Sequence, residues 1–208
     1  MGDDVADSTP PGGSRDAAEV LRDRRILVGI SGGIAAYKTA TLVSRLVQRG
    51  AQVRVIMTSA GTRFITPLTL QSLSGHPVLT SPWDHDDRPD SQHVGLARWC
   101  DALVIAPASA DLIAKLAAGL TPDLVSLTAS ALPGSTPLLL APAMNADMWD
   151  HPILQRNLAT LRELLPNLAE VGPDAGWQAC RTRGQGRMAE PPAILEALAT
   201  LLSNSPKS

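Results

Sequence analysis

Short runs of apolar residues without polar alternation recur along the chain, separated by stretches in which apolar residues repeat with helical spacing. The unalternating runs predict strands buried on both faces of a sheet, and they lie at 26–30, 53–57, 103–106, 138–140 and 168–171, with a brief candidate at 78–79. The helical pattern covers 34–49, 62–73, 112–118, 124–131, 153–165 and 193–202. Strands that alternate with helices form parallel sheets. The pattern therefore predicts an α/β fold: a Rossmann-like (flavodoxin-like) open parallel sheet with helices on both faces, in a single domain.

The two ends of the chain and one internal stretch lack this pattern. Residues 1–23 combine Pro-Pro-Gly-Gly with mixed charges and have little to bury, which predicts a disordered tail, although 17–21 can extend a first helix. Residues 203–208 are expected to fray, and the polar stretch 80–92 is expected to form an exposed loop. The folded domain is therefore expected to span 24–202.

The charge and cysteine content narrow the class of protein. A net charge of −2 and scattered Lys and Arg residues give no basic patch for nucleic acid or an anionic membrane. No apolar run approaches the roughly 20 residues that span a bilayer, and the acidic N-terminus does not resemble a secretory signal. Cys100 and Cys180 do not form a disulfide framework. These features predict a reduced, cytoplasmic globular protein that binds neither nucleic acid nor membrane.

Small polar turns follow three of the predicted strands. They are Ser31-Gly32-Gly33, Thr58-Ser59-Ala60 and Ser109-Ala110-Asp111. The carboxyl ends of parallel strands share one sheet edge, and unpaired N–H groups at a helix start suit a phosphate. The glycine turn alone could be a plain tight turn, because it does not have the Gly-x-Gly-x-x-Gly spacing, and Lys38 lies too far on for a Walker loop. Taken together, the turns favour a flavin or nucleotide site over a site for a bare phosphate.

Three further side chains are candidates for chemistry at the same edge. Asn145 follows the strand 138–140 and could clamp a substrate carboxylate, or simply cap a helix. Cys180 lies in the predicted loop 172–188, which is rich in glycine and arginine, and could donate a proton, or be an inert exposed thiol. His93 precedes a strand in a predicted loop, where a lone histidine is often structural. Cys100 is expected to be buried and inert, and no His, Cys or Asp spacing indicates a metal site.

Several motifs together resemble one enzyme family over about 25–202. They are Ile-Ser-Gly-Gly-Ile-Ala-Ala-Tyr-Lys at 30–38, His93, Pro-Ala-Ser-Ala-Asp at 107–111, Pro-Ala-Met-Asn-Ala-Asp-Met-Trp at 142–149 and Gly-Arg-Met-Ala-Glu-Pro at 186–191. On these residues the chain resembles the flavin-containing cysteine decarboxylases, and among them the members that act on 4′-phosphopantothenoylcysteine. The Pro-x-Met-Asn-x-x-Met motif is the specific part of this likeness.

The resemblance implies bound FMN and a residue set that acts on it. By position, the FMN contacts would be Gly32, Gly33, Ile34, Thr58, Ser59, Ala60, Ser109, Ala110, Asp111, Leu112 and Ala143. The catalytic residues would be His93, Asn145 and Cys180, and the substrate-binding residues Asn145, Met148, Arg187 and Met188. The resemblance further implies a homotrimer or homododecamer with sites shared between subunits, and a phosphopantothenoylcysteine synthetase on a separate chain or in a fusion.

The resemblance implies that the substrate loses CO2 through a thioaldehyde and an ene-thiol intermediate. In this reaction Asn145 would hold the substrate carboxylate, and His93 would act as a base or orient the reacting groups. Cys180 would give the final proton. Family members that decarboxylate peptidyl cysteines stop at the ene-thiol, and some relatives are noncatalytic flavin-binding regulatory subunits; both remain alternatives. The sequence departs from the family pattern at Asp111, often Asn, at Trp177, and at Arg181-Thr182, usually Gly-Asp.

Overall fold

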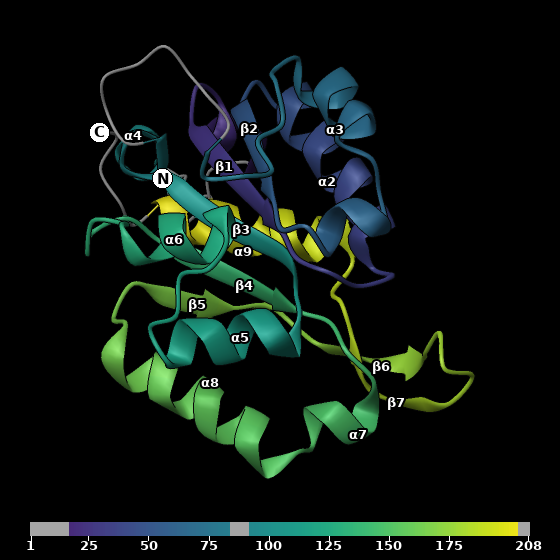
Figure 1. The fold of residues 1–208 in the computed structure, drawn as a ribbon. Helices are drawn as coiled ribbons and strands as arrows, with labels where there is room; N and C mark the ends of the chain where they lie inside the picture. Colours follow the sequence, from purple (N-terminus) through teal and green to yellow (C-terminus); the bar gives the residue numbers. More distant parts are fainter. Residues whose placement is uncertain (1–16, 84–91, 204–208) are drawn as a thin grey trace, which may run out of the picture.

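The computed structural model describes residues 17–83 and 92–203, in which a parallel sheet runs through the centre (Figure 1). Its strands are β1 (Arg25–Ile30), β2 (Gln52–Met57), β3 (Ala102–Ala108), β4 (Leu138–Pro142) and β5 (Leu168–Glu170). They are ordered β2-β1-β3-β4-β5, the flavodoxin-like order in which the chain changes direction between β1 and β3. Val28, for example, pairs with Val55 of β2 on one side and with Val104 of β3 on the other. The predicted Rossmann-like fold is confirmed.

Helices cover both faces of this sheet, as the unalternating strands require. One face carries α1 (Ala17–Leu21), α2 (Ala36–Gln48), α3 (Pro67–Ser74) and α9 (Pro191–Ser203). The other carries α4 (Gln92–Trp99), α5 (Ala110–Ala117), α6 (Leu124–Ser130) and α8 (Pro152–Leu164), with the 3-10 turn η1 (Gly61–Arg63) and the short helix α7 (Ala146–Trp149) in connections. Figure 1 shows α5 and α8 in front of the sheet and α9 behind it.

The two hydrophobic layers follow from the period-2 geometry of the strands. In β1, Ile26, Val28 and Ile30 pack with the α2 and α9 layer, whereas Leu27 packs with the α5 and α8 layer. All of these side chains are fully buried. Because successive side chains of a strand point to opposite faces, an apolar run can serve both layers at once. The strand assignments from sequence rest on this property.

The structure differs from the sequence expectations mainly at connections. The predicted strand 78–79 is an isolated bridge between Ile56 and Leu79. The segment 172–188, expected to be a loop, contains the antiparallel hairpin β6 (Asp174–Trp177) and β7 (Arg183–Arg187). Its residues are mostly glycine, polar or charged, so the sequence has no alternation of apolar and polar residues that would predict a hairpin. The hairpin projects from the body near α7 (Figure 1).

The last residues of the expected disordered tail 1–23 belong to the folded domain. The helix α1 (Ala17–Leu21) packs against α9, and Leu21 is fully buried in the core. The centre of the expected exposed loop, residues 84–91, lies outside the described residues. The same is true of residues 1–16 and 204–208. The folded unit therefore begins several residues before the expected boundary at 24.

The docking of α1 gives a prediction for stability. Leu21→Ala should lower the free energy of unfolding by about 2–4 kcal/mol, because it removes a fully buried side chain from the α1–α9 contact. Glu19→Ala on the exposed side of the same helix should change it by less than about 0.5 kcal/mol. Urea unfolding of both variants measures the difference. Equal midpoints for Leu21→Ala and the unmutated chain would show that α1 does not belong to the cooperative unit.

Candidate active site

A cleft of about 980 Å³ opens where the chain leaves the carboxyl ends of β1, β3 and β4. This is the switch point between β1 and β3, where open α/β sheets build their sites. The β6–β7 hairpin forms a further wall. The predicted site residues that line the cleft are Gly32, Gly33, Ile34, Ala60, Ser109, Ala110, Asp111, Ala143, Asn145, Met148, Cys180, Arg187 and Met188.

The turn after β1 presents backbone donors to the cleft. Gly32 packs so closely on the neighbouring turn that a Cβ there would lie 2.6 Å from the Cβ of Ala60. Within the described part of the chain, the N–H groups of Gly32 to Ala35 donate no hydrogen bond. They precede α2, whose dipole is positive at this end. The turn therefore offers a negatively charged group several free donors.

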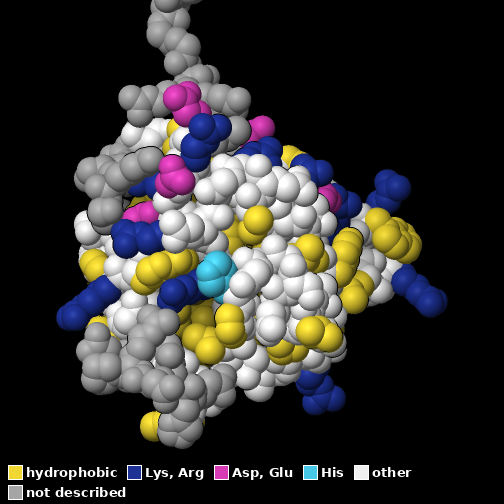
Figure 2. Space-filling model, turned by 90° about the horizontal axis from the view of Figure 1, so that it is seen from above, with side chains coloured by type: hydrophobic (Ala, Val, Ile, Leu, Met, Phe, Trp, Pro, Cys, Tyr) yellow, Lys and Arg dark blue, Asp and Glu magenta, His cyan; other side chains and the backbone are white. Residues whose placement is uncertain are grey.

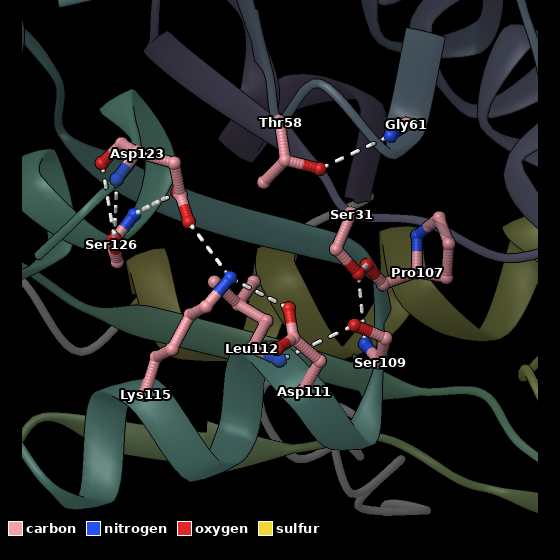
Figure 3. A network of polar contacts seen from close by, with 10 residues as sticks. All are labelled: Ser31, Thr58, Gly61, Pro107, Ser109, Asp111, Leu112, Lys115, Asp123 and Ser126. Carbon is pink, nitrogen blue, oxygen red and sulfur yellow. Dashed lines mark hydrogen bonds and ion pairs between the residues drawn. The ribbon is translucent and has the colours of Figure 1, made fainter. Parts of the chain in front are cut away.

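The hydroxyl groups of Ser31, Thr58 and Ser109 make hydrogen bonds that fix the three polar turns (Figure 3). The Ser31 hydroxyl donates to the Pro107 carbonyl at 2.7 Å and accepts from the Ser109 N–H at 2.8 Å. The Thr58 Oγ1 accepts from the Gly61 N–H at 3.1 Å. The Ser109 hydroxyl caps α5 by accepting from the Leu112 N–H. The turns thus reach the cleft mainly through backbone and small side chains.

Some predicted FMN contacts do not line the cleft. The Thr58 side chain is buried behind its own turn, and Leu112 is fully buried in the layer beneath α5. Ser59 also lies outside the lining residues. The tips of the turns therefore line the cleft, whereas the residues that anchor these tips lie inside the protein.

The Asp111 carboxylate at the start of α5 has a paired charge. Lys115 Nζ lies 2.7 Å from Asp111 Oδ2 and 3.4 Å from Asp123 Oδ2 (Figure 3). The hydrogen bond to Asp111 raises the pKa of Lys115, which keeps the ammonium charged beside the carboxylate. Lys115 thus compensates the acid that stands where the family pattern often has a neutral Asn.

Asn145 serves as the N-cap of α7 and still keeps its amide nitrogen available. Its Oδ1 accepts from the Met148 N–H at 2.8 Å. Among the described residues, its Nδ2 has no acceptor. The capping bond fixes the rotation of the side chain, so that Nδ2 can donate to an acceptor in the cleft. The cap and the substrate clamp, alternatives in the sequence, are compatible in the structure.

Cys180 lies in the turn of the β6–β7 hairpin and lines the cleft. Its Sγ is 3.0 Å from Thr182 Oγ1. The next residue, Arg181, has a φ of 64°, a conformation that favours glycine. The unusual Arg at this position therefore occupies a backbone conformation that suits the glycine of the family pattern. Cys100, by contrast, is buried as expected, and burial raises the pKa of its thiol to about 12.

Sequence reasoning missed an ion-pair cluster at the stem of the hairpin. Lys38 Nζ donates to Glu190 Oε1 at 2.8 Å and to the Met188 carbonyl at 3.1 Å, and Arg187 reaches the same Glu190 oxygen at 2.9 Å. The hydrogen bond from Lys38 lowers the pKa of Glu190. Lys38 and Glu190 both lie in motifs quoted above, but their spacing of 152 residues gives no signal that they meet.

His93 does not line the cleft formed by the described residues of this chain. It lies in the first turn of α4, not in a loop, and is half-buried. The helix α4 packs against α6. Two of the three expected catalytic residues, Asn145 and Cys180, therefore meet in one cleft without the third.

No group of three or more His, Cys, Asp or Glu residues in the described segments could hold a metal ion. No helix of 17–83 or 92–203 combines the length and apolar character needed to cross a membrane.

Along most of its length the chain is similar to part of larger bifunctional proteins. The coenzyme A biosynthesis bifunctional proteins CoaBC of Vibrio parahaemolyticus and Haemophilus influenzae are 45% identical over 200 residues and 46% identical over 183 residues. These matches cover 90% and 88% of this chain but 49% and 45% of the relatives, so the chain spans about half their length.

Solved structures give the same likeness. A PPC decarboxylase mutant complexed with pantothenoylaminoethenethiol has a TM-score of 0.78 and 32% identity, and covers 88% of this chain and 100% of its own. The FMN binding protein AtHal3 has a TM-score of 0.77 and 32% identity, and the match covers 89% of this chain and 100% of AtHal3.

The Flavoprotein family matches residues 14–203, which include the whole sheet and the hairpin. The chain belongs to the Flavoprotein family.

Proposed function

We propose that this chain binds FMN in the cleft and decarboxylates 4′-phosphopantothenoylcysteine to 4′-phosphopantetheine in coenzyme A biosynthesis. One observation carries the proposal: a single cleft joins free backbone donors, the free amide of Asn145 and the Cys180 thiol. The bifunctional coenzyme A biosynthesis proteins and the PPC decarboxylase among its relatives support the same substrate. A phosphopantothenoylcysteine synthetase activity has to supply this substrate in the cytoplasm.

The residues present fit FMN. The free N–H groups of Gly32 to Ala35 suit its phosphate, and the small residues Ala60, Ala110 and Ala143 leave room for a flat ring beside them. A bound flavin supplies an acceptor for the electron pair of the substrate's C–S unit and returns that pair after CO2 has left. The protein contributes binding, orientation and protons.

Asn145 holds the substrate carboxylate through Nδ2. An amide donates a hydrogen bond without a permanent positive charge, so it binds the carboxylate without the stabilisation that would oppose its loss as CO2. The cap bond between Oδ1 and the Met148 N–H holds the donor in place. The exposed side chain of Met148 lines the cleft beside it.

Cys180 donates the proton that completes the reaction. Loss of CO2 leaves an ene-thiol, and the Sγ–H proton passes to the carbon that carried the carboxylate while the hydride equivalent returns to the carbon that carries sulfur. The Cys180 thiolate then takes a proton from solvent. A peptidyl-cysteine decarboxylase would stop before this step and would not use Cys180, so a thiol at the cleft favours the small substrate.

His93 reaches the site from a neighbouring subunit in a homotrimer or a homododecamer. Large apolar side chains at the cleft, Ile34 and Tyr37, are 59% and 61% exposed in the single chain. Phe64 and Leu68, which follow the turn at Ala60 in the sequence, are also exposed. Figure 2 shows hydrophobic side chains scattered over the face seen from above, with many Lys and Arg side chains towards its edges. Exposed apolar side chains at the rim of the cleft, such as Ile34 and Tyr37, suit a subunit contact there.

The proposed reaction is tested by substrate turnover. The purified protein should be yellow, and it should convert 4′-phosphopantothenoylcysteine to CO2 and 4′-phosphopantetheine. Cys180→Ser should still release CO2 but accumulate the ene-thiol, because only the last proton is lost; mass spectrometry separates the products. If the protein binds flavin but releases no CO2, it is a noncatalytic flavin-binding subunit. If it turns over a peptide that ends in cysteine but not 4′-phosphopantothenoylcysteine, it is a peptidyl-cysteine decarboxylase.

The turn after β1 gives a test of cofactor binding that does not depend on activity. Gly32→Ala places a Cβ within 2.6 Å of the Ala60 Cβ, which should displace the donor turn and weaken FMN binding about tenfold, within the 1–3 kcal/mol typical of overpacking. Fluorescence titration of the apoprotein with FMN measures this. Gly134→Ala, which meets nothing within 4 Å, is the matched control. Unchanged FMN affinity in Gly32→Ala would place the phosphate elsewhere.

Sharing of the site between subunits gives a complementation test. His93→Asn and Asn145→Asp should each be inactive, the latter because a carboxylate repels the substrate carboxylate. In mixed oligomers about one quarter of the sites should regain both groups if each site joins two subunits. Unfolding, mixing and refolding of the two variants followed by CO2 assay measures this. A mixture as inactive as its parents would contradict a shared site.

A further inference from the structure

The Gln178 side chain is buried in a hairpin turn whose neighbouring residues are exposed. It is 5% exposed, whereas Trp177 is 59% exposed and both Ala179 and Cys180 face solvent. A buried amide is costly unless its polar atoms have partners. Gln178 is therefore held in place by specific contacts rather than by apolar packing.

Both ends of the Gln178 amide have partners. Oε1 accepts from the Ala146 N–H at 3.1 Å and from the Cys180 thiol at 3.6 Å. Nε2 donates to the carbonyl of Gln185 at 3.1 Å and to that of Gly184 at 3.4 Å. The partners fix the orientation of the amide, because a backbone N–H can only donate and a carbonyl can only accept.

These contacts connect the hairpin to the segment that carries Asn145. Ala146 is the first residue of α7, and Asn145 is its N-cap. The strand β7 lies directly on this segment, because a Cβ at Gly184 would lie 2.5 Å from the Ala146 Cβ. The Gly186 carbonyl also accepts from the Met144 N–H at 2.9 Å. Gln178 is thus the side chain that joins the carboxylate clamp to the thiol loop.

The same residue closes the turn that presents Cys180. The Gln178 N–H donates to the Thr182 carbonyl, and the Gln178 carbonyl accepts from the Arg181 N–H, both at 2.9 Å. The thiol lies between Gln178 Oε1 and Thr182 Oγ1. Since an amide oxygen only accepts, its contact with sulfur is one that only the protonated thiol can make.

We propose that Gln178 is a positioning residue that holds the protonated Cys180 thiol in register with the Asn145 clamp, so that the thiol meets the carbon from which CO2 has left. This inference rests on the function proposed above. Gln178 touches neither of the reacting carbons; it acts through Cys180 and through the α7 segment. Its loss should therefore affect the final proton transfer more than CO2 release.

The test compares the same substitution at two glutamines of one hairpin. Gln178→Met keeps the length but removes every amide hydrogen bond. Gln185→Met changes an exposed side chain that makes only a long hydrogen bond, at 3.4 Å, to the Pro173 carbonyl, and it serves as the control. Gln178→Met should release CO2 within about twofold of the unmutated rate but raise the ratio of ene-thiol to 4′-phosphopantetheine at least about tenfold, the size expected when a proton donor is misplaced. Gln185→Met should leave the ratio unchanged. An unchanged ratio in Gln178→Met would overturn the proposal.

A second variant tests the same docking without removing a polar group. Gly184→Ala should push β7 from Ala146 and raise the ene-thiol ratio in the same direction. If Gln178→Met does not fold, an unchanged ratio in Gly184→Ala overturns the proposal and an increased one supports it.

Alkylation of Cys180 separates this proposal from the function on which it rests. Cys100 is 3% exposed, so iodoacetamide should label Cys180 in the folded protein. Without the contact to Oε1, Gln178→Met should be labelled about threefold faster or more. Equal labelling rates would contradict the positioning role even if the unmutated protein proved to release no CO2, which by itself would refute the proposed function.

Discussion

The floor of the cleft depends on the Ser31 hydroxyl, which ties the turn after β1 to the turn after β3. These strands are neighbours, but the chain leaves them toward opposite faces of the sheet, into α2 on one side and α5 on the other. The turns would otherwise be free to separate at this point. By donating to Pro107 and accepting from Ser109, one buried hydroxyl sets the distance between them. The free donors of the first turn and the start of α5 then face the same space.

The site combines this rigid floor with a wall that has little apolar packing. The floor rests on strands whose side chains are fully buried on both faces. The hairpin, in contrast, is attached through polar groups: the amide of Gln178, the carbonyl of Gly186 and the Lys38–Glu190 pair. Polar attachment is directional, so it fixes the place of the Cys180 thiol while burying little surface. The floor of the cleft and the Cys180 thiol thus have different physical supports.

The parts predictable from sequence are those in which one local pattern decides the outcome. Apolar runs such as 103–106 had to be buried strands, and their polar ends had to gather at one edge. The hairpin 174–187 was missed because its strands have neither alternation nor β-branched residues, and because contacts with Ala146 and Met144 stabilise it from outside. Lys38 could not be singled out, since Glu190 lies 152 residues away in the sequence. Gln178 could not be singled out because its burial depends on the hairpin and on the contact with Ala146, neither of which a local pattern indicates. His93 was placed in a loop because Gly95 and the polar residues before it obscured the short helix α4.

The Lys38 ammonium has a consequence for how the cleft can open. Detaching the stem of the hairpin would strip this buried charge of both Glu190 and the Met188 carbonyl, which is costly in a water-poor environment. The turn of the hairpin is held as well, because the buried Gln178 amide accepts a hydrogen bond from the Ala146 N–H. Displacing this wall of the cleft therefore breaks polar contacts of a buried group at the stem or at the turn, so the hairpin resists movement at both of its ends.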